Sequence, residues 1–191
     1  MNKNAKKFEE WHWKIYENYL NATIHLRIWW LIHNEKYVRF ANRNKEFFSF
    51  DAYAHLTAGV LGITRIFDRD KRSINFEKFL EFSLKNKEDI EKVFPNCKFC
   101  NHEKSQQISK EVNELRGSLE EIRTWRDKLF AHVERDFKSK PIRWGHFKNI
   151  IDFLERHILD YGSKPNHSFT KAKDFEDSIR IEKFFEKYFK N

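Results

Sequence analysis

The amino-acid sequence predicts an all-α fold, a bundle of five to seven helices, and two observations support that prediction. Only 5 glycines and 3 prolines occur in 191 residues, so few residues interrupt a helix. Apolar residues recur at steps of three and four, the spacing of one helix face, and no stretch shows the period of two that marks a strand. At this length we expect residues 1–191 to form a single domain with a sizeable core.

The first half of the chain divides into three expected helices. The first covers about residues 8–33, and the polar stretch 34–44 that follows can be helix or loop. The second covers about residues 50–67, and Asn75 is a plausible N-cap for the third, residues 76–85. The second helix is rich in small residues that allow close contact with a neighbour, namely Ala52, Ala54, Ala58, Gly59 and Gly62.

The second half begins with a connector, residues 87–103, that holds the Cys-x-x-Cys pair. One long amphipathic helix should then run from about Ile108 through Val133, followed by a helix over residues 143–161. Residues 163–191 are expected to form a C-terminal helical extension, whose last helix would carry apolar residues on two sides. A helix of that kind is suited to lie between neighbours, and a subunit boundary is one such place.

Cys97 and Cys100 are the two cysteines of the chain. They could be half a zinc site, with His102 as a third ligand and a partner subunit completing it, or a redox pair, or incidental thiols. A zinc ribbon needs a second pair, which the sequence lacks. We therefore expect no metal and no cofactor.

The charge is positive and unevenly placed. The formal net charge is +8, and residues 123–148 hold eight basic against three acidic groups. This concentration suits a polyanion such as RNA, although a solvated charged surface would look the same. The beginning of the chain has no signal-peptide pattern and no stretch is apolar enough to span a membrane, so we expect a cytoplasmic protein.

Arg126 stands out because it falls in the middle of the apolar stripe of the long helix. A guanidinium there must be paired with a carboxylate from a neighbouring helix, or it must line a cleft or an interface. His132 follows six residues later. An arginine can stabilise charge on a phosphate while a histidine exchanges a proton with a ribose hydroxyl, which together suffice to cleave RNA.

In one straight helix, Arg126 and His132 would not point towards the same substrate. Six residues turn about 600°, so His132 would point about 120° away from Arg126 and lie ~9 Å along the axis. The helix should therefore end or bend between Arg126 and Glu134, or two subunits should contribute. Arg27 and His33 have the same spacing, but Ile28 between them is apolar and the segment is rich in tryptophan.

The sequence Arg126-Asp127 with His132 resembles the Arg-polar-x(n)-His signature of the HEPN superfamily. Residues 63–68 and 74–80 are similar to a region that precedes this helix in the AbiU-type abortive-infection HEPN-like proteins. The resemblance implies a helical fold, a homodimer with both Arg/His motifs in one basic cleft, and metal-independent ribonuclease activity in phage defence or toxin–antitoxin systems. Within the second patch, Arg65 and Asp68 could form a buried ion pair or support the cleft.

We therefore predict a HEPN-type endoribonuclease in which Arg126 binds the scissile phosphate, His132 is the general acid and base, and Asp127 orients one of them. Arg123, Lys128 and Arg135 should hold the RNA backbone. The expected partners are RNA, a second copy of the chain and possibly an antitoxin protein. The alternative is a helical RNA-binding or protein-interaction module without catalysis.

Overall fold

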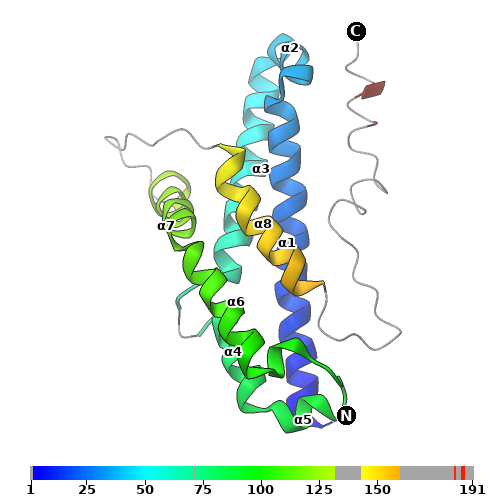
Figure 1. Ribbon diagram of the computed structural model, residues 1–191. Helices are drawn as coiled ribbons and strands as arrows, with labels where there is room; N and C mark the ends of the chain where they lie inside the picture. The colour runs from blue at the N-terminus through cyan, green and yellow to red at the C-terminus, as the bar shows by residue number, and fades with distance from the viewer. Residues whose placement is uncertain (1, 71, 132–142, 160–182, 184–185, 188–191) are drawn as a thin grey trace.

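A computed structural model describes residues 2–70, 72–131 and 143–159, together with Lys183, Glu186 and Lys187. These residues form eight α-helices, one 3₁₀ turn and one π-helix, and they contain no strand (Figure 1). The predicted all-α class is confirmed. The described part of the chain already has more helices than the five to seven expected, because a predicted long helix is divided and the connector contains a helix of its own.

Two long antiparallel helices form the centre of the bundle. α1 (Lys3–His33) and α3 (Lys45–Ile66) lie side by side, and α2 (Glu35–Arg43) closes one end (Figure 1). Asn34 ends α1 and caps α2, since its side-chain oxygen accepts a hydrogen bond from the amide of Lys36 at 2.9 Å. The stretch 34–44 is therefore helical.

Gly59 and Gly62 allow α1 and α3 to approach closely. A Cβ added at Gly62 would lie 2.8 Å from the Cβ of Ala22, and one at Gly59 would lie 2.5 Å from Cγ of Leu26. Both distances are too short for carbon atoms in contact. The predicted use of small residues for close packing is thus correct for these two glycines, whereas Ala54 lies exposed on the other side of α3.

The predicted connector is part of the core. α4 (Phe76–Lys85) begins at its predicted cap Asn75, and α5 (Lys87–Glu91) and the 3₁₀ turn η1 (Lys98–Cys100) follow it. The rings of this region pack on Phe8 of α1, whose centroid lies 5.1 Å from that of Phe79 and 5.4 Å from that of Phe94. Buried residues between 90 and 100 are Ile90, Phe94, Cys97, Phe99 and Cys100.

The single helix expected over residues 108–133 is divided into three elements. α6 (His102–Glu114) ends at Leu115, α7 (Arg116–Trp125) begins directly after it, and the π-helix η2 (Arg126–Ala131) continues α7. The division has a tertiary cause, since α6 packs on α4 while α7 packs on α3. With two separate helix axes, the apolar face of α6 can pack on α4 and that of α7 on α3. A single straight helix could not bury both faces on these partners.

α8 (Trp144–Ile158) crosses the front of α1 and completes the described bundle (Figure 1). It buries Phe147, Ile150 and Leu154. The predicted extension, residues 163–191, lies outside the described residues apart from Lys183, Glu186 and Lys187, and Glu186 binds Lys36 at 2.7 Å.

His12 joins α1 to the end of α8 from inside the core. Its ring is 1% exposed and its Nε2–H donates a hydrogen bond to the carbonyl oxygen of Ile158 at 2.8 Å. Burial lowers the pKa of His12 to about 3, although the bond to Ile158 partly opposes this. The imidazole is therefore neutral in the folded protein at physiological pH.

The substitution Gly62→Ala should lower the free energy of unfolding by about 1–3 kcal/mol, because the added methyl group pushes α1 and α3 apart. The matched control is Gly117→Ala in α7, where an added Cβ has nothing within 4 Å. This control should be neutral or stabilising by up to about 1 kcal/mol. Denaturant titrations of both variants measure the difference, and equal effects would contradict the packing argument.

The stability of the protein should fall as the pH drops from 6.5 towards 3. In this window unfolded His12 binds a proton that folded His12 does not, so its contribution declines by about 1.4 kcal/mol per pH unit. The variant His12→Gln keeps a donor but cannot titrate. The difference in unfolding free energy between wild type and variant should therefore shrink on acidification, and a constant difference would show that folding does not change the pKa of His12.

Candidate functional site

The predicted site begins where α7 changes into a π-helix. Arg126 and Asp127 are the first two residues of η2. The expected departure from a straight α-helix therefore starts at Arg126. π-helical turns are rare and are frequently found at functional sites. His132 and Arg135 lie outside the described residues, so the Arg126–His132 pair remains a prediction.

The side chain of Arg126 lies at the surface and is held by its neighbour. It is 29% exposed, and its Nε donates a hydrogen bond to Oδ1 of Asp127 at 2.6 Å. This bond raises the pKa of Arg126, and the charge of Asp68 acts in the same direction. Within the described residues, no hydrogen bond occupies its two terminal amino groups. The alternative that Arg126 is buried and paired with a carboxylate of a neighbouring helix is therefore wrong. Its guanidinium is partly accessible to solvent and can bind an anion.

Arg123 braces α7 against the end of α3. One terminal nitrogen donates to the carbonyl oxygen of Phe67, and the other binds Glu120 at 2.8 Å. Its side chain is 15% exposed. The guanidinium that was predicted to contact RNA is thus engaged by the protein, and it fixes the position of the adjacent Arg126.

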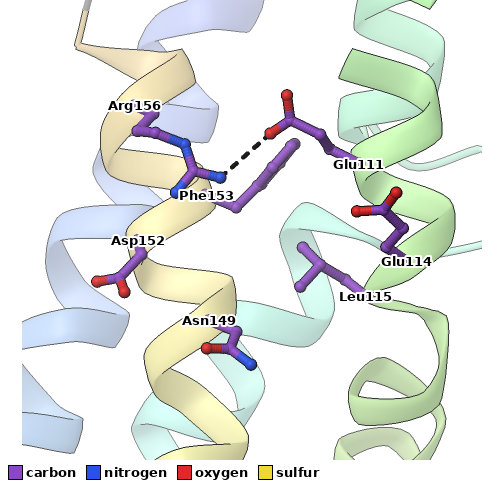
Figure 2. A pocket seen from close by; sticks show the side chains of 7 residues that line it. All are labelled: Glu111, Glu114, Leu115, Asn149, Asp152, Phe153 and Arg156. Carbon is purple, nitrogen blue, oxygen red and sulfur yellow. Dashed lines mark hydrogen bonds and ion pairs between the residues drawn. The ribbon is translucent and has the colours of Figure 1, made fainter. Parts of the chain in front are cut away.

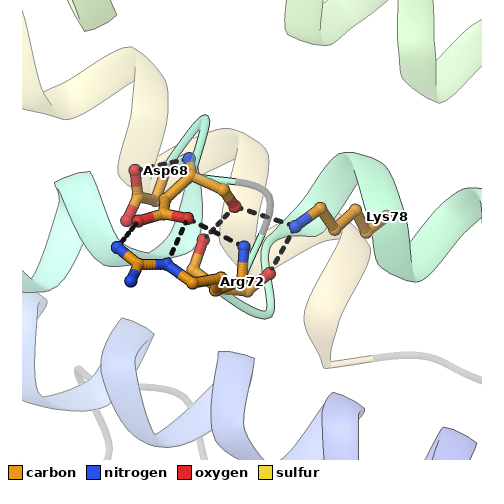
Figure 3. Close-up of polar contacts among 5 residues, drawn as sticks. Asp68, Arg72 and Lys78 are labelled. Atoms are coloured by element: carbon orange, nitrogen blue, oxygen red, sulfur yellow. Dashed lines mark hydrogen bonds and ion pairs between the residues drawn. The ribbon is translucent and has the colours of Figure 1, made fainter.

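The loop after α3 is held by polar contacts (Figure 3). The amide of Asp70 donates to Oδ1 of Asp68 at 3.0 Å, and Nζ of Lys78 donates to the carbonyl oxygens of Asp70 and Ser73, both at 2.8 Å. Arg72 binds Asp70 and lowers the pKa of that carboxyl group. These contacts hold Asp68 in place. The negative charge of Asp68, at the end of α3, helps to raise the pKa of Arg126 in η2.

Two segments far apart in the sequence, residues 63–68 and 123–127, therefore meet in the fold. The interpretation of Arg65 and Asp68 as a buried ion pair is wrong. Arg65 is exposed, and in the described part of the chain no ion pair joins it to Asp68. Asp68 is half-buried and lies in the electrostatic field of Arg126.

Two residues near this position were missed from the sequence. Arg69 is 62% exposed and binds Glu120 at 2.7 Å, which adds a cation from the α3 end. His146, at the start of α8, lies 3.5 Å from Glu121 and packs its ring edge-on to Trp125 at 5.0 Å. Neither has a sequence signal, because each approaches α7 from an element distant in the chain.

A polar cavity of about 290 Å³ opens between α6 and α8, away from Arg126 (Figure 2). Arg156 and His157 both donate to Oε2 of Glu111, at 3.1 and 2.9 Å. Burial would raise the pKa of Glu111, but these two bonds outweigh it and lower the pKa. With Glu114 and Asp152 also in its wall, the cavity repels phosphate and is unsuited to RNA.

Cys97 and Cys100 are core residues. They are 2% and 1% exposed, and a thiol hydrogen bond between them lowers the pKa of Cys97 and raises that of Cys100. His102 is exposed and its Nε2 contacts Gln106, so it does not join the pair. Among the described residues, no group of three or more His, Cys, Asp or Glu side chains is arranged to hold a metal ion.

No helix within the described ranges is both long enough and apolar enough to cross a membrane.

Comparison with known families gives one match. The model of the HEPN family described as AbiU2 matches residues 5–185, nearly the whole chain. Comparison with curated proteins and with solved structures gives no match.

Removal of the brace should destabilise the fold. Arg123→Ala removes the part-buried hydrogen bond to the carbonyl group of Phe67, and we expect a loss of about 1–3 kcal/mol in the free energy of unfolding. The matched control is Arg116→Ala, an exposed arginine of the same helix, which should change stability by less than about 0.5 kcal/mol. Thermal or denaturant unfolding compares the two, and an equal loss in both variants would count against the brace.

Proposed function

Because the chain belongs to the AbiU2 family of HEPN proteins, we propose that it is a metal-independent endoribonuclease acting in phage defence or as a toxin. The observation that carries the proposal is the surface guanidinium of Arg126, oriented by Asp127 on a π-helix. An oriented cation whose two terminal amino groups are bound by no described residue is suited to a phosphate group.

In the proposed reaction the ribose 2′-hydroxyl attacks the adjacent phosphorus. His132 takes the hydroxyl proton or returns one to the departing 5′-oxygen, and Arg126 stabilises the charge that develops on the phosphate oxygens. Asp127 holds the guanidinium through Nε, and no hydrogen bond from a described residue occupies the two terminal amino groups. The products are a 2′,3′-cyclic phosphate and a 5′-hydroxyl.

The RNA backbone contacts in this proposal come from Lys128, Arg135 and the exposed Arg69, while Arg123 serves as a brace. We further propose that the active form is a cytoplasmic homodimer, which places two Arg126 motifs near one RNA. A cognate antitoxin protein is a proposed partner of the same surface.

The proposal predicts cleavage of a structured RNA by purified protein in the presence of EDTA, with 2′,3′-cyclic phosphate ends. His132→Ala should reduce the cleavage rate at least about 100-fold with RNA affinity nearly unchanged, because a proton shuttle acts in the transition state. Arg126→Ala should reduce both the rate and the affinity, since it also removes a phosphate contact.

The control is His33→Ala, which alters the other histidine that follows an arginine by six residues. His33 bonds to the carbonyl oxygen of Trp29 within α1, and its variant should cleave RNA like the wild type. Wild-type protein that binds RNA without cutting it would assign the chain to the non-catalytic RNA-binding modules. Full activity of His132→Ala would remove this histidine from the mechanism.

A further inference from the structure

Three large aromatic side chains lie exposed on the first turns of α3. Phe50 is 76% exposed, Phe47 65% and Tyr53 51%. They follow at steps of three residues, so each lies about 4.5 Å further along the helix axis than the one before. Among the described residues, the next most exposed large hydrophobic side chain is Trp13 on α1. Exposed rings that cluster in this way mark an interaction site.

The fold holds the first of these rings in place. The ring of Phe47 packs edge-on to that of Phe48, with centroids 5.2 Å apart, and Phe48 is buried against the core. One side of Phe47 is therefore supported by the protein while the rest of the ring faces solvent. A ring held in this way can receive a flat ligand with little loss of side-chain freedom.

Basic side chains lie beside the rings, at the end of the bundle that α2 closes (Figure 1). Residues 36–50 hold four basic residues and one acidic residue, Glu46. The basic side chains are all exposed, and they belong to Lys36, Arg39, Arg43 and Lys45. Lys36 binds Glu186. Within the described part of the chain, no hydrogen bond or ion pair engages the other three, so they are available to an anion.

Exposed rings beside cations are suited to single-stranded RNA. An unpaired base stacks on an aromatic ring, and arginine or lysine binds the neighbouring phosphate group. Successive bases of one strand lie about 3.4 Å apart, which is close to the rise from one ring to the next. Consecutive unpaired bases can therefore meet consecutive rings, whereas the bases of a duplex are already stacked on one another.

We propose that this end of the bundle binds an unpaired segment of the RNA substrate, at a distance from Arg126. The site, called here the α2–α3 tip, consists of the rings of Phe47, Phe50 and Tyr53 and the cations of Arg39, Arg43 and Lys45. The rings stack on bases and the cations bind phosphate groups. The inference rests on the proposed function for its choice of RNA, and its binding test requires no cleavage.

Charge favours RNA over a second copy of the chain as the occupant. Two copies that met through their tips would bring like charges together, and the repulsion between them would oppose the contact. RNA neutralises the same charges. A membrane surface of anionic lipids also combines negative charge with apolar groups, and the experiment below distinguishes it from RNA.

The tip and Arg126 lie near opposite ends of α3. This helix has 22 residues and is therefore about 33 Å long. The residue after its far end, Phe67, is the one bound by Arg123 next to the proposed catalytic arginine. A strand with a spacing of about 3.4 Å covers this length with about ten nucleotides. The preferred substrate should thus carry an unpaired segment about ten nucleotides from the cleaved bond.

Binding is measured in the His132→Ala background, so that the RNA is not cut. With a fluorescent single-stranded RNA of about 20 nucleotides, Phe47→Ser and Phe50→Ser should each raise the dissociation constant about 5- to 100-fold, as expected for one stacked base. Arg43→Ala should lower the slope of log Kd against log salt concentration by about 0.7, because one phosphate contact is lost. Circular dichroism should show unchanged helix content, since all three side chains are exposed.

Two residues of α1 supply the controls. Trp13→Ser removes an exposed ring outside the tip, whose indole nitrogen donates to Glu17 at 2.7 Å. Lys14→Ala removes an exposed cation next to it. Both variants should bind single-stranded RNA like their parent. Duplex RNA should bind equally to Phe50→Ser and its parent, because its bases are not available for stacking.

Three results would overturn the proposal. These are unchanged affinity in Phe47→Ser and Phe50→Ser, an equal loss in Trp13→Ser, or an equal loss for duplex RNA. If Phe50→Ser binds RNA normally but loses binding to phosphatidylserine vesicles, the tip is a membrane contact. If it binds RNA normally but changes the mass measured by light scattering, the tip is a protein contact.

Cleavage gives a second readout with His132 intact. Phe50→Ser should raise the KM of an RNA of about 20 nucleotides with kcat unchanged, because the tip lies far from the reacting atoms. Cleavage of an RNA of about six nucleotides should be unaffected, since it is too short to reach the tip. An equal effect on both lengths would contradict the proposed span. Absence of cleavage by the wild type would refute the proposed function and leave the binding test in force.

Discussion

The close contact of α1 with α3 at Gly59 and Gly62 is the constraint on which the arrangement of the molecule depends. It fixes the distance between the two longest helices of the described bundle, and every other described element packs on this pair directly or through one neighbour. Because the contact is between glycine and the side chains of Ala22 and Leu26, it leaves no space for adjustment. α3 is thereby held in one position along its length, including the end that approaches Arg126.

The two sides of α3 have different roles in the structure. Its inner side supplies core residues such as Val60 and Ile63, while its outer side is neutral and aromatic near the middle and charged at the end. The carbonyl group of Phe67 and the carboxylate of Asp68 lie at that end, against α7. One helix therefore connects the core to the proposed RNA site.

Charge is separated in the same way. The exposed Arg69 and the half-buried Arg126 lie around the junction of α3 with α7, whereas Glu111, Glu114 and Asp152 line the cavity between α6 and α8. A polyanion is attracted to the first region and repelled by the second. The distribution of charge thus supports the junction over the cavity between α6 and α8 as the proposed place where RNA would bind.

The sequence by itself determined the features that depend on near neighbours in the chain. Helix periodicity, the cap at Asn75 and the pairing of Arg126 with the adjacent Asp127 all involve residues within a few positions of one another. The division of the long helix at Leu115, the burial of the connector and the engagement of Arg123 by Phe67 were decided by the tertiary structure. The Arg123–Phe67 bond joins residues 56 positions apart, and its existence depends on how α3 and α7 pack. Local patterns state which face of a helix is apolar, but only the packed fold decides which neighbour that face meets and which charged groups remain free at the surface.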